Sequence, residues 1–328
     1  MEVRVYGILS CLSLKERRYN MEGFIISSNS GVYEVFVDGT VYKCKARGKF
    51  RNEGIKPVVG DNVSIQVISD TEGYIEVVHE RKNKLVRPPI ANVDQAVIII
   101  SIVEPELSPS LLNRFLTLVE DANVEPIICL SKLDKTKDEE KLRNVISYYS
   151  SLGYKVIEYS AKTKEGLDRI KEILKNKKSV LTGQSGVGKS TLLNALFPEL
   201  NLEVGEYSKA LGRGRHTTRE VSFIRAYDGW IADTPGFSST KLEMDAIRLA
   251  AIYPGYNEYF DKCKFRGCLH INEVGCKIKE LVDEGTLSLR GHQDYLSFQR
   301  ELVEGKVEYD KKNGSGAKKS YREKKKKK

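Results

Sequence analysis

The stretch LTGQSGVGKSTLLNAL at residues 181–196 constrains the fold more than any other part of the chain. It joins an apolar run to a helical pattern through a turn of the form Gly-x4-Gly-Lys-Ser. The glycines let the backbone curl so that successive N–H groups point at a phosphate, and the helix N-terminus adds its positive end. The stretch therefore predicts a strand, a phosphate-binding loop (P-loop) and a helix in an α/β domain.

Two side chains of this loop suit a nucleoside triphosphate that carries magnesium. Lys189 would reach the β- and γ-phosphates, and the Ser190 hydroxyl would bind Mg²⁺. The alternative is a glycine-rich turn without a ligand. We expect the nucleotide to contact Gly183, Gln184, Ser185, Gly186, Val187, Gly188, Lys189, Ser190 and Thr191.

A second phosphate element follows in the segment IADTPGF. Asp233 ends an apolar strand, where its carboxylate can hold Mg²⁺ through water, and Gly236 can offer its N–H to the γ-phosphate. Between the two elements lies GRGRHTTRE, a polar, glycine-broken stretch that we expect to be a mobile loop. Thr217 or Thr218 in this loop would complete the Mg²⁺ shell; the sequence leaves open which one.

The base is read by a third element. The segment SKLD ends the strand pattern PIICL, and SAK ends the pattern YKVIEY. In GTPases a carboxylate at the end of Asn/Thr-Lys-x-Asp accepts two hydrogen bonds from guanine, a donor pair that adenine lacks. Asp134 would do this, with the Lys132 stem along the ring and the Ala161 N–H at the guanine oxygen. Ser131 departs from the usual Asn or Thr, although its hydroxyl can brace the P-loop. The predicted base-reading residues are Ser131, Lys132, Leu133, Asp134, Ser160, Ala161 and Lys162.

These motifs stand in an unusual order. An ordinary GTPase begins with the P-loop, whereas here the base-reading segments come first. A doubly wound sheet keeps its contacts when its ends are joined and another loop is cut, so the order predicts a circularly permuted domain. This permutation would lead the DTPG segment directly into a C-terminal domain, which nucleotide state could then move.

The remaining pattern divides the chain into regions. Residues 21–80 contain five short strands rich in Val, Ile and Tyr, which predicts a small closed barrel of OB or SH3-like type. A basic, proline-marked linker follows at 81–94. Apolar strands then alternate with helices, as in a doubly wound parallel sheet with its ligand outside the carboxyl ends of the strands. From about 243 the pattern is helical.

Three of the six cysteines cluster near a histidine in this last region. The spacing Cys-x4-Cys-x-His-x5-Cys offers three thiolates and an imidazole, a closed tetrahedral set for structural Zn²⁺. Reduced cysteines without metal are the alternative, and catalytic zinc is disfavoured because four protein ligands leave no open position. The predicted ligands are Cys263, Cys268, His270 and Cys276.

Hydrolysis must be assisted by another group. Phe237 stands where many GTPases have the glutamine that orients water, so intrinsic hydrolysis should be slow. His216 in the predicted switch loop is the candidate to orient or polarise water, and an ordinary loop histidine is the alternative.

The motif order, with a barrel before it and a zinc cluster after it, resembles the RsgA (YjeQ/YloQ) family of circularly permuted, ribosome small-subunit-dependent GTPases. The likeness covers roughly 21–300 and includes RGKFR, RPPIANVDQ, GQSGVGKST, GRGRHTT and the cysteine cluster. It implies GTP hydrolysis during late maturation of the small subunit, with contacts to its rRNA, and it favours the role of His216.

The expected domains are an extension at 1–20, an OB-fold RNA-binding domain at 21–82, a permuted GTPase domain at 83–242, a helical zinc-binding domain at 243–310 and a basic disordered tail at 311–328.

Charge and hydropathy agree with this assignment. The net charge of +9 resides in the C-terminal tail, because the remaining chain is neutral overall. Such an arm favours polyanions, and KARGKFR at 45–51 is a further candidate RNA contact, although a solvated basic loop is a close alternative. No transmembrane helix or signal peptide is predicted, so we expect a cytoplasmic monomer. The functional alternatives are a P-loop kinase or ATPase, and an RNA-binding protein that uses nucleotide only as a structural ligand.

Overall fold

The chain divides into two compact units, with the division after Glu80, and each unit is described by itself. The residues that the computed structural model describes are 20–86, 88–198, 221–233 and 241–304. The predicted basic tail and nearly all of the predicted N-terminal extension lie outside these ranges. Four predicted site residues also lie outside them: His216, Thr217, Thr218 and Gly236.

The first unit is a closed five-stranded barrel with the strand order β1-β2-β3-β5-β4, as the sequence predicted. Its core comes from strand alternation, since Tyr33, Val35 and Val37 of β2 point inward while their neighbours do not. β1 pairs with both β2 and β4, and β3 pairs in parallel with β5, so no edge is left open. The strands are β1 (Asn20–Asn29), β2 (Val32–Val37), β3 (Thr40–Ala46), β4 (Asn62–Ser69) and β5 (Glu72–Val78).

The second unit contains a six-stranded sheet of order β10-β9-β8-β11-β13-β12. All neighbours are parallel except the edge pair β12–β13, so the predicted doubly wound sheet is confirmed with one antiparallel edge. Every residue of β8 is buried, which explains its unbroken apolar run. The strands are β8 (Gln95–Ser101), β9 (Glu125–Ser131), β10 (Lys155–Glu158), β11 (Lys178–Thr182), β12 (Phe223–Ala226) and β13 (Gly229–Asp233).

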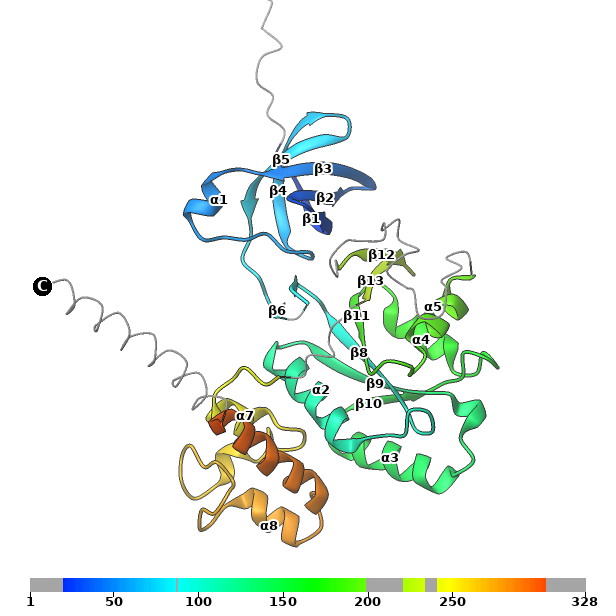
Figure 1. Cartoon of the computed structure of the whole chain (residues 1–328), viewed down its shortest axis with the longest axis vertical. Helices are drawn as coiled ribbons and strands as arrows, with labels where there is room; N and C mark the ends of the chain where they lie inside the picture. Colours follow the sequence, from blue (N-terminus) through cyan, green and yellow to red (C-terminus); the bar gives the residue numbers. More distant parts are fainter. Residues whose placement is uncertain (1–19, 87, 199–220, 234–240, 305–328) are drawn as a thin grey trace, which may run out of the picture. The chain divides into compact units, whose positions relative to one another are not determined.

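Helices cover both faces of this sheet. Figure 1 shows α2 and α3 on one side and α4 and α5 on the other. Ser108 is the N-cap of α2 and accepts a hydrogen bond from the Leu111 N–H at 3.3 Å, with Pro109 as the first helical residue. The helices are α2 (Pro109–Asp121), α3 (Glu139–Ser151), α4 (Leu167–Leu174) and α5 (Lys189–Leu196). Among the described residues, no helix has the length and apolarity needed to cross a membrane.

The C-terminal module is helical and packs on α2. Asn113 of α2 is buried and joins two tyrosines: its Nδ2 donates to Tyr253 Oη at 3.1 Å, and Tyr149 Oη donates to its Oδ1 at 3.0 Å. Arg114 adds two bonds to the Glu301 carboxylate at 3.0 and 2.6 Å. These contacts attach the module to α2, and Tyr148 and Leu152 at the end of α3 also pack against it. Its elements are α7 (Ala246–Ile252), the short 3-10 helix η3 (Phe260–Lys262), α8 (Lys277–Asp283) and a helix over 289–304.

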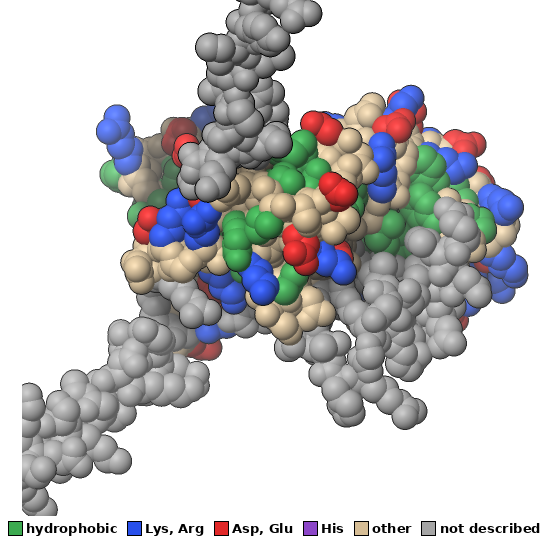
Figure 2. Space-filling model, turned by 90° about the horizontal axis from the view of Figure 1, so that it is seen from above, with side chains coloured by type: hydrophobic (Ala, Val, Ile, Leu, Met, Phe, Trp, Pro, Cys, Tyr) green, Lys and Arg blue, Asp and Glu red, His purple; other side chains and the backbone are tan. Residues whose placement is uncertain are grey.

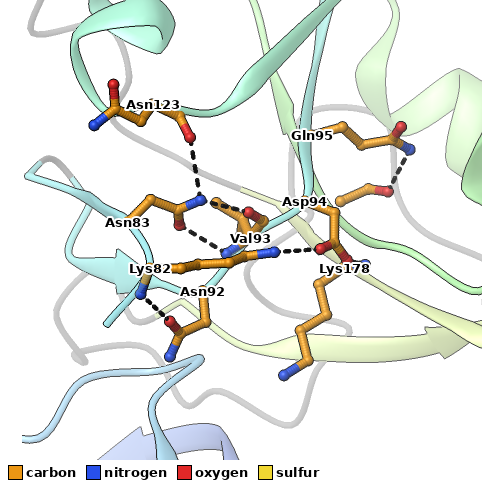
Figure 3. A network of polar contacts seen from close by, with 9 residues as sticks. Lys82, Asn83, Asn92, Val93, Asp94, Gln95, Asn123 and Lys178 are labelled. Carbon is orange, nitrogen blue, oxygen red and sulfur yellow. Dashed lines mark hydrogen bonds and ion pairs between the residues drawn. The ribbon is translucent and has the colours of Figure 1, made fainter. Parts of the chain in front are cut away.

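The predicted linker at 81–94 folds as a short hairpin of β6 (Lys84–Leu85) and β7 (Ile90–Ala91). Hydrogen bonds between asparagine side chains and backbone groups close the hairpin, and Asn83 Nδ2 also donates to the Asn123 carbonyl oxygen, before β9, at 3.3 Å (Figure 3). The segment is therefore an ordered part of this unit.

Candidate functional site

The P-loop lies between β11 and α5 as predicted. Gly183 packs so closely on β8 that an added Cβ would lie 2.1 Å from the Ile99 carbonyl oxygen. Gly186 has φ +81°, in the left-handed region that favours glycine. Lys189 Nζ donates to the carbonyl oxygens of Gly183 and Gln184 at 2.7 and 3.0 Å, so its ammonium lies over the curled backbone where phosphates would bind.

The base-reading segment meets this loop. Ser131 is buried at the end of β9, and its hydroxyl lies 2.7 Å from the Val187 carbonyl oxygen of the P-loop. Lys132 Nζ donates to the Gly186 carbonyl oxygen at 2.8 Å and also to the carbonyl oxygen of Glu104, in the segment after β8. Residues far apart in the sequence are thus joined at one edge of the sheet.

Asp134 is oriented by the SAK segment. Ser160 Oγ donates to Asp134 Oδ1 at 2.6 Å, and the Thr163 N–H donates to Ser160 Oγ at 3.1 Å. Asp134 itself is exposed, whereas Ala161, which follows Ser160, is half-buried and packs against the sheet core. The carboxylate is therefore fixed at one oxygen and open at the other, as a base-reading group requires.

All of these groups follow the carboxyl ends of parallel strands. β11 ends at Thr182, β9 at Ser131 and β10 at Glu158, and the register pairs Leu181 of β11 with Asp233 of β13. Parallel strands present these ends at a single edge, where open α/β sheets bind ligands. The P-loop, SKLD and SAK are brought together there, with the end of β13 at the same edge.

The cysteine cluster forms a second centre, in the C-terminal module. One potential ligand atom from each of Cys263, Cys268, His270 and Cys276 lies within 4.8 Å of all the others. His270 Nδ1 is 3.6 Å from Cys263 Sγ and 3.3 Å from Cys276 Sγ, and these two sulfurs are 4.0 Å apart. A tetrahedral zinc site would require about 3.8 Å between sulfurs and about 3.6 Å between sulfur and nitrogen. The donor set therefore fits Zn²⁺.

Burial keeps the His270 imidazole and the Cys268 thiol uncharged without a cation. Burial lowers the pKa of His270 to about 4 and raises the pKa of the Cys268 thiol to about 12. The imidazole is thus neutral and able to coordinate at pH 7, while a metal ion would displace the thiol protons. His270 has φ +54°, so the loop must hold it in a disfavoured conformation.

Glu273 holds this loop in place, and the sequence analysis missed it. Its carboxylate accepts hydrogen bonds from the backbone N–H groups of Leu269, Ile271 and Asn272 at 2.7, 2.8 and 3.0 Å. Burial alone would raise the pKa of Glu273, but the bonds from its own and these backbone amides lower it. The signal available in the sequence was a carboxylate inside a short glycine-containing loop between two ligands.

Basic and aromatic side chains also lie on the barrel. Tyr74 is 40% exposed, and the Arg47 guanidinium lies 5.5 Å from its ring centroid. Arg47 also pairs with Glu76, so the surface is mixed in charge. Figure 2 shows the same mixture, with blue, red and green side chains interspersed on the face in view. The segment KARGKFR leads into the helix α1 (Lys49–Asn52), in which Phe50 is buried.

A P-loop placed after the base-reading strands, at one edge of a doubly wound sheet, defines a circularly permuted GTPase domain. Models of two domains match the chain: RsgA GTPase over residues 78–243 and the RsgA N-terminal domain over residues 22–75. The chain therefore belongs to the RsgA GTPase family and is a GTP hydrolase.

Individual relatives agree over nearly the whole length. The chain is 47% identical over 293 residues to the small ribosomal subunit biogenesis GTPase RsgA of Geobacillus sp. (strain WCH70), covering 88% of this chain and 99% of that relative. It is 41% identical to the protein of the same name from Caldanaerobacter subterraneus, with coverages of 87% and 96%.

Two solved structures are similar as well. The crystal structure of YloQ, described as a circularly permuted GTPase, has a TM-score of 0.75 and 38% identity, with 88% of this chain and 97% of that chain covered. YjeQ from Thermotoga maritima has a TM-score of 0.75 and 32% identity, with coverages of 87% and 99%.

Proposed function

We propose that this protein binds the small ribosomal subunit in its GTP-bound form, hydrolyses GTP there and leaves on hydrolysis, during late maturation of the subunit. One observation carries this proposal: Lys132 bonds to the P-loop, and Asp134, two residues further on, is held by Ser160 at the same edge of the sheet. The names of the curated relatives support the ribosomal role. We further propose that the protein acts as a cytoplasmic monomer, with the domain bounds that the sequence analysis predicts.

The nucleotide site would work by positioning and charge. Asp134 would accept the N1–H and amino protons of guanine, with the Ala161 N–H at the guanine oxygen. Lys189 would leave its loop carbonyls for the β- and γ-phosphates, to which the curled backbone amides would also donate. Ser190 and Asp233 would hold Mg²⁺, which neutralises charge on the phosphates when bound.

Hydrolysis would depend on the segments around the γ-phosphate. Gly236 would donate its N–H, Thr217 or Thr218 would complete the Mg²⁺ shell, and His216 would orient the attacking water. Docking on the ribosome would order the switch loop and so complete the site. This step explains why turnover should be slow for the protein alone.

The cysteine cluster would hold one structural Zn²⁺. The fit of the donor distances supports this assignment. Since all four positions are taken by protein ligands, the ion would stabilise the module and take no part in hydrolysis. The module and the barrel would both contact rRNA.

Turnover with and without purified small subunits tests the proposal. We expect subunits to stimulate GTP hydrolysis strongly in the wild type but not in Lys189→Ala, because the variant lacks the phosphate-binding ammonium. Equal wild-type rates with and without subunits would contradict ribosome activation and favour a protein that uses nucleotide structurally. Equal use of ATP and GTP would favour a P-loop ATPase.

A further inference from the structure

A group of lysines lies at the edge of the second unit opposite the nucleotide site. Lys82 and Lys84 come from the 81–94 hairpin. Lys175 and Lys177 come from the turn between α4 and β11, and Lys178 is the first residue of β11. We propose that these five residues, the basic edge, form a contact surface for the phosphate backbone of RNA. The inference rests on the proposed function and assigns a further part of the subunit-binding surface.

One carboxylate ties the two segments together. Two hydrogen bonds join Asp94 to Lys178. The Asp94 N–H donates to the Lys178 carbonyl oxygen at 2.8 Å, and the Lys178 N–H donates to the Asp94 carboxylate oxygen Oδ2 at 2.7 Å. Lys82 Nζ donates to Asp94 Oδ1, so Lys82 and Lys178 lie on either side of one acid (Figure 3).

Asparagine side chains fix the hairpin in this position. The Lys82 N–H donates to Asn92 Oδ1 at 2.9 Å. Asn83 Nδ2 donates to the Val93 carbonyl oxygen at 2.7 Å, and the Val93 N–H donates back to Asn83 Oδ1 at 3.0 Å. The hairpin is therefore ordered, and the bonds of Asp94 hold Lys82 beside Lys178 at the start of β11 (Figure 3).

Acidic and basic side chains both lie on this surface. Asp94 pairs with Lys82, and Asp121 at the end of α2 pairs with Arg248. Glu125 at the start of β9 and Asp228 in the β12–β13 turn also lie at this edge. Burial is the main reason that the pKa of Lys178 falls to about 8; within this net shift Asp94 raises the pKa and Lys82 lowers it. An anion bound here would reduce the repulsion between these ammonium groups.

Phosphate of a nucleic acid is the anion that this arrangement suits. Lys175 and Lys177 are exposed, and an ammonium on a flexible stem binds phosphate as a point charge without demanding one geometry. The lysines come from two segments that Asp94 ties together at one edge of the sheet, so a repeating polyanion could contact more than one of them. The strands that end at the nucleotide site begin at this edge, so RNA here would leave the nucleotide site open.

The test compares two double variants with the same loss of charge. Lys175→Gln/Lys177→Gln removes two exposed members of the basic edge, and Lys137→Gln/Arg143→Gln removes two exposed cations near α3. Dissociation constants are measured for purified small subunits and for protein-free small-subunit rRNA over a series of KCl concentrations. Binding of fluorescent GDP and thermal melting report the folded nucleotide domain.

We expect the basic-edge variant to bind both probes about 5- to 30-fold more weakly, with the salt slope reduced by about 2, and to bind GDP as the wild type does. The α3 variant should match the wild type. Unchanged affinity and slope would overturn the inference, as would weaker binding to subunits with unchanged binding to bare rRNA, which would indicate an acidic protein partner. Wild-type protein that fails to bind subunits would instead contradict the proposed function.

Discussion

Removal of the Ser131 hydroxyl tests how the base-reading segment is coupled to the P-loop. In Ser131→Ala, the bond to the Val187 carbonyl oxygen, 2.7 Å long and buried, is lost. The hydroxyl has one proton, and the Ile100 carbonyl oxygen at 3.1 Å is the poorer acceptor, so a single strong bond is at stake. One such bond contributes about 0.5–1.5 kcal/mol, which corresponds to about 2- to 13-fold in affinity.

The assay is titration of fluorescent GDP and GTP analogues, with Ser131→Thr as the matched control because it keeps the hydroxyl. We expect Ser131→Ala to bind both nucleotides more weakly by this factor and Ser131→Thr to stay near the wild type. If both variants bind like the wild type, the hydroxyl does not brace the P-loop, and the two segments are held together by other contacts.

Three further predictions concern stability and metal binding. Asn113→Ala leaves the buried Tyr149 hydroxyl without its acceptor, so we expect the free energy of unfolding in urea to fall by about 1–3 kcal/mol, whereas an unchanged value would contradict the bridge. Because the pKa of Lys178 falls to about 8 on folding from about 10.4, the unfolded chain binds more protons in between. Stability should therefore rise from pH 8 to pH 10 in the wild type but not in Lys178→Met; parallel melting curves would refute this sign. Glu273→Gln should lose zinc to a chelating dye at lower dye concentration than the wild type, and equal loss would show that the carboxylate does not hold the metal loop.

The motifs were predictable because each one is local. The P-loop needs glycines in a short stretch between a strand and a helix, and the sequence contains them in order. The continuous apolar run of β8 is likewise typical of a strand that is covered on both faces. The alternation of apolar and polar residues in β2 and its neighbours is typical of strands with one buried face, as in a barrel.

Several contacts between distant segments could not be predicted, although the contact of Ser131 with the P-loop was. The bond from Lys132 to the Glu104 carbonyl oxygen depends on where the segment after β8 lies, and the Ser160–Asp134 bond depends on the pairing of β9 with β10. The attachment of the C-terminal module through Asn113 was hidden because a single asparagine in an amphipathic helix carries no signal of its partner.

The hairpin at 81–94 shows a different limit. Its prolines and lysines are typical of a flexible linker, but its order comes from asparagine side chains that bond to backbone groups ten residues away. Composition reports the preferences of a segment, whereas tertiary hydrogen bonds decide whether it is fixed.

The central claim is that one carboxylate selects guanine for a phosphate loop far away in the sequence. The most direct measurement is competition of unlabelled GTP and ATP against fluorescent GDP, for the wild type and for Asp134→Ala. The account predicts a preference for GTP of at least about 1,000-fold in the wild type and its near-complete loss in the variant. A variant that still prefers GTP by the wild-type factor would contradict it.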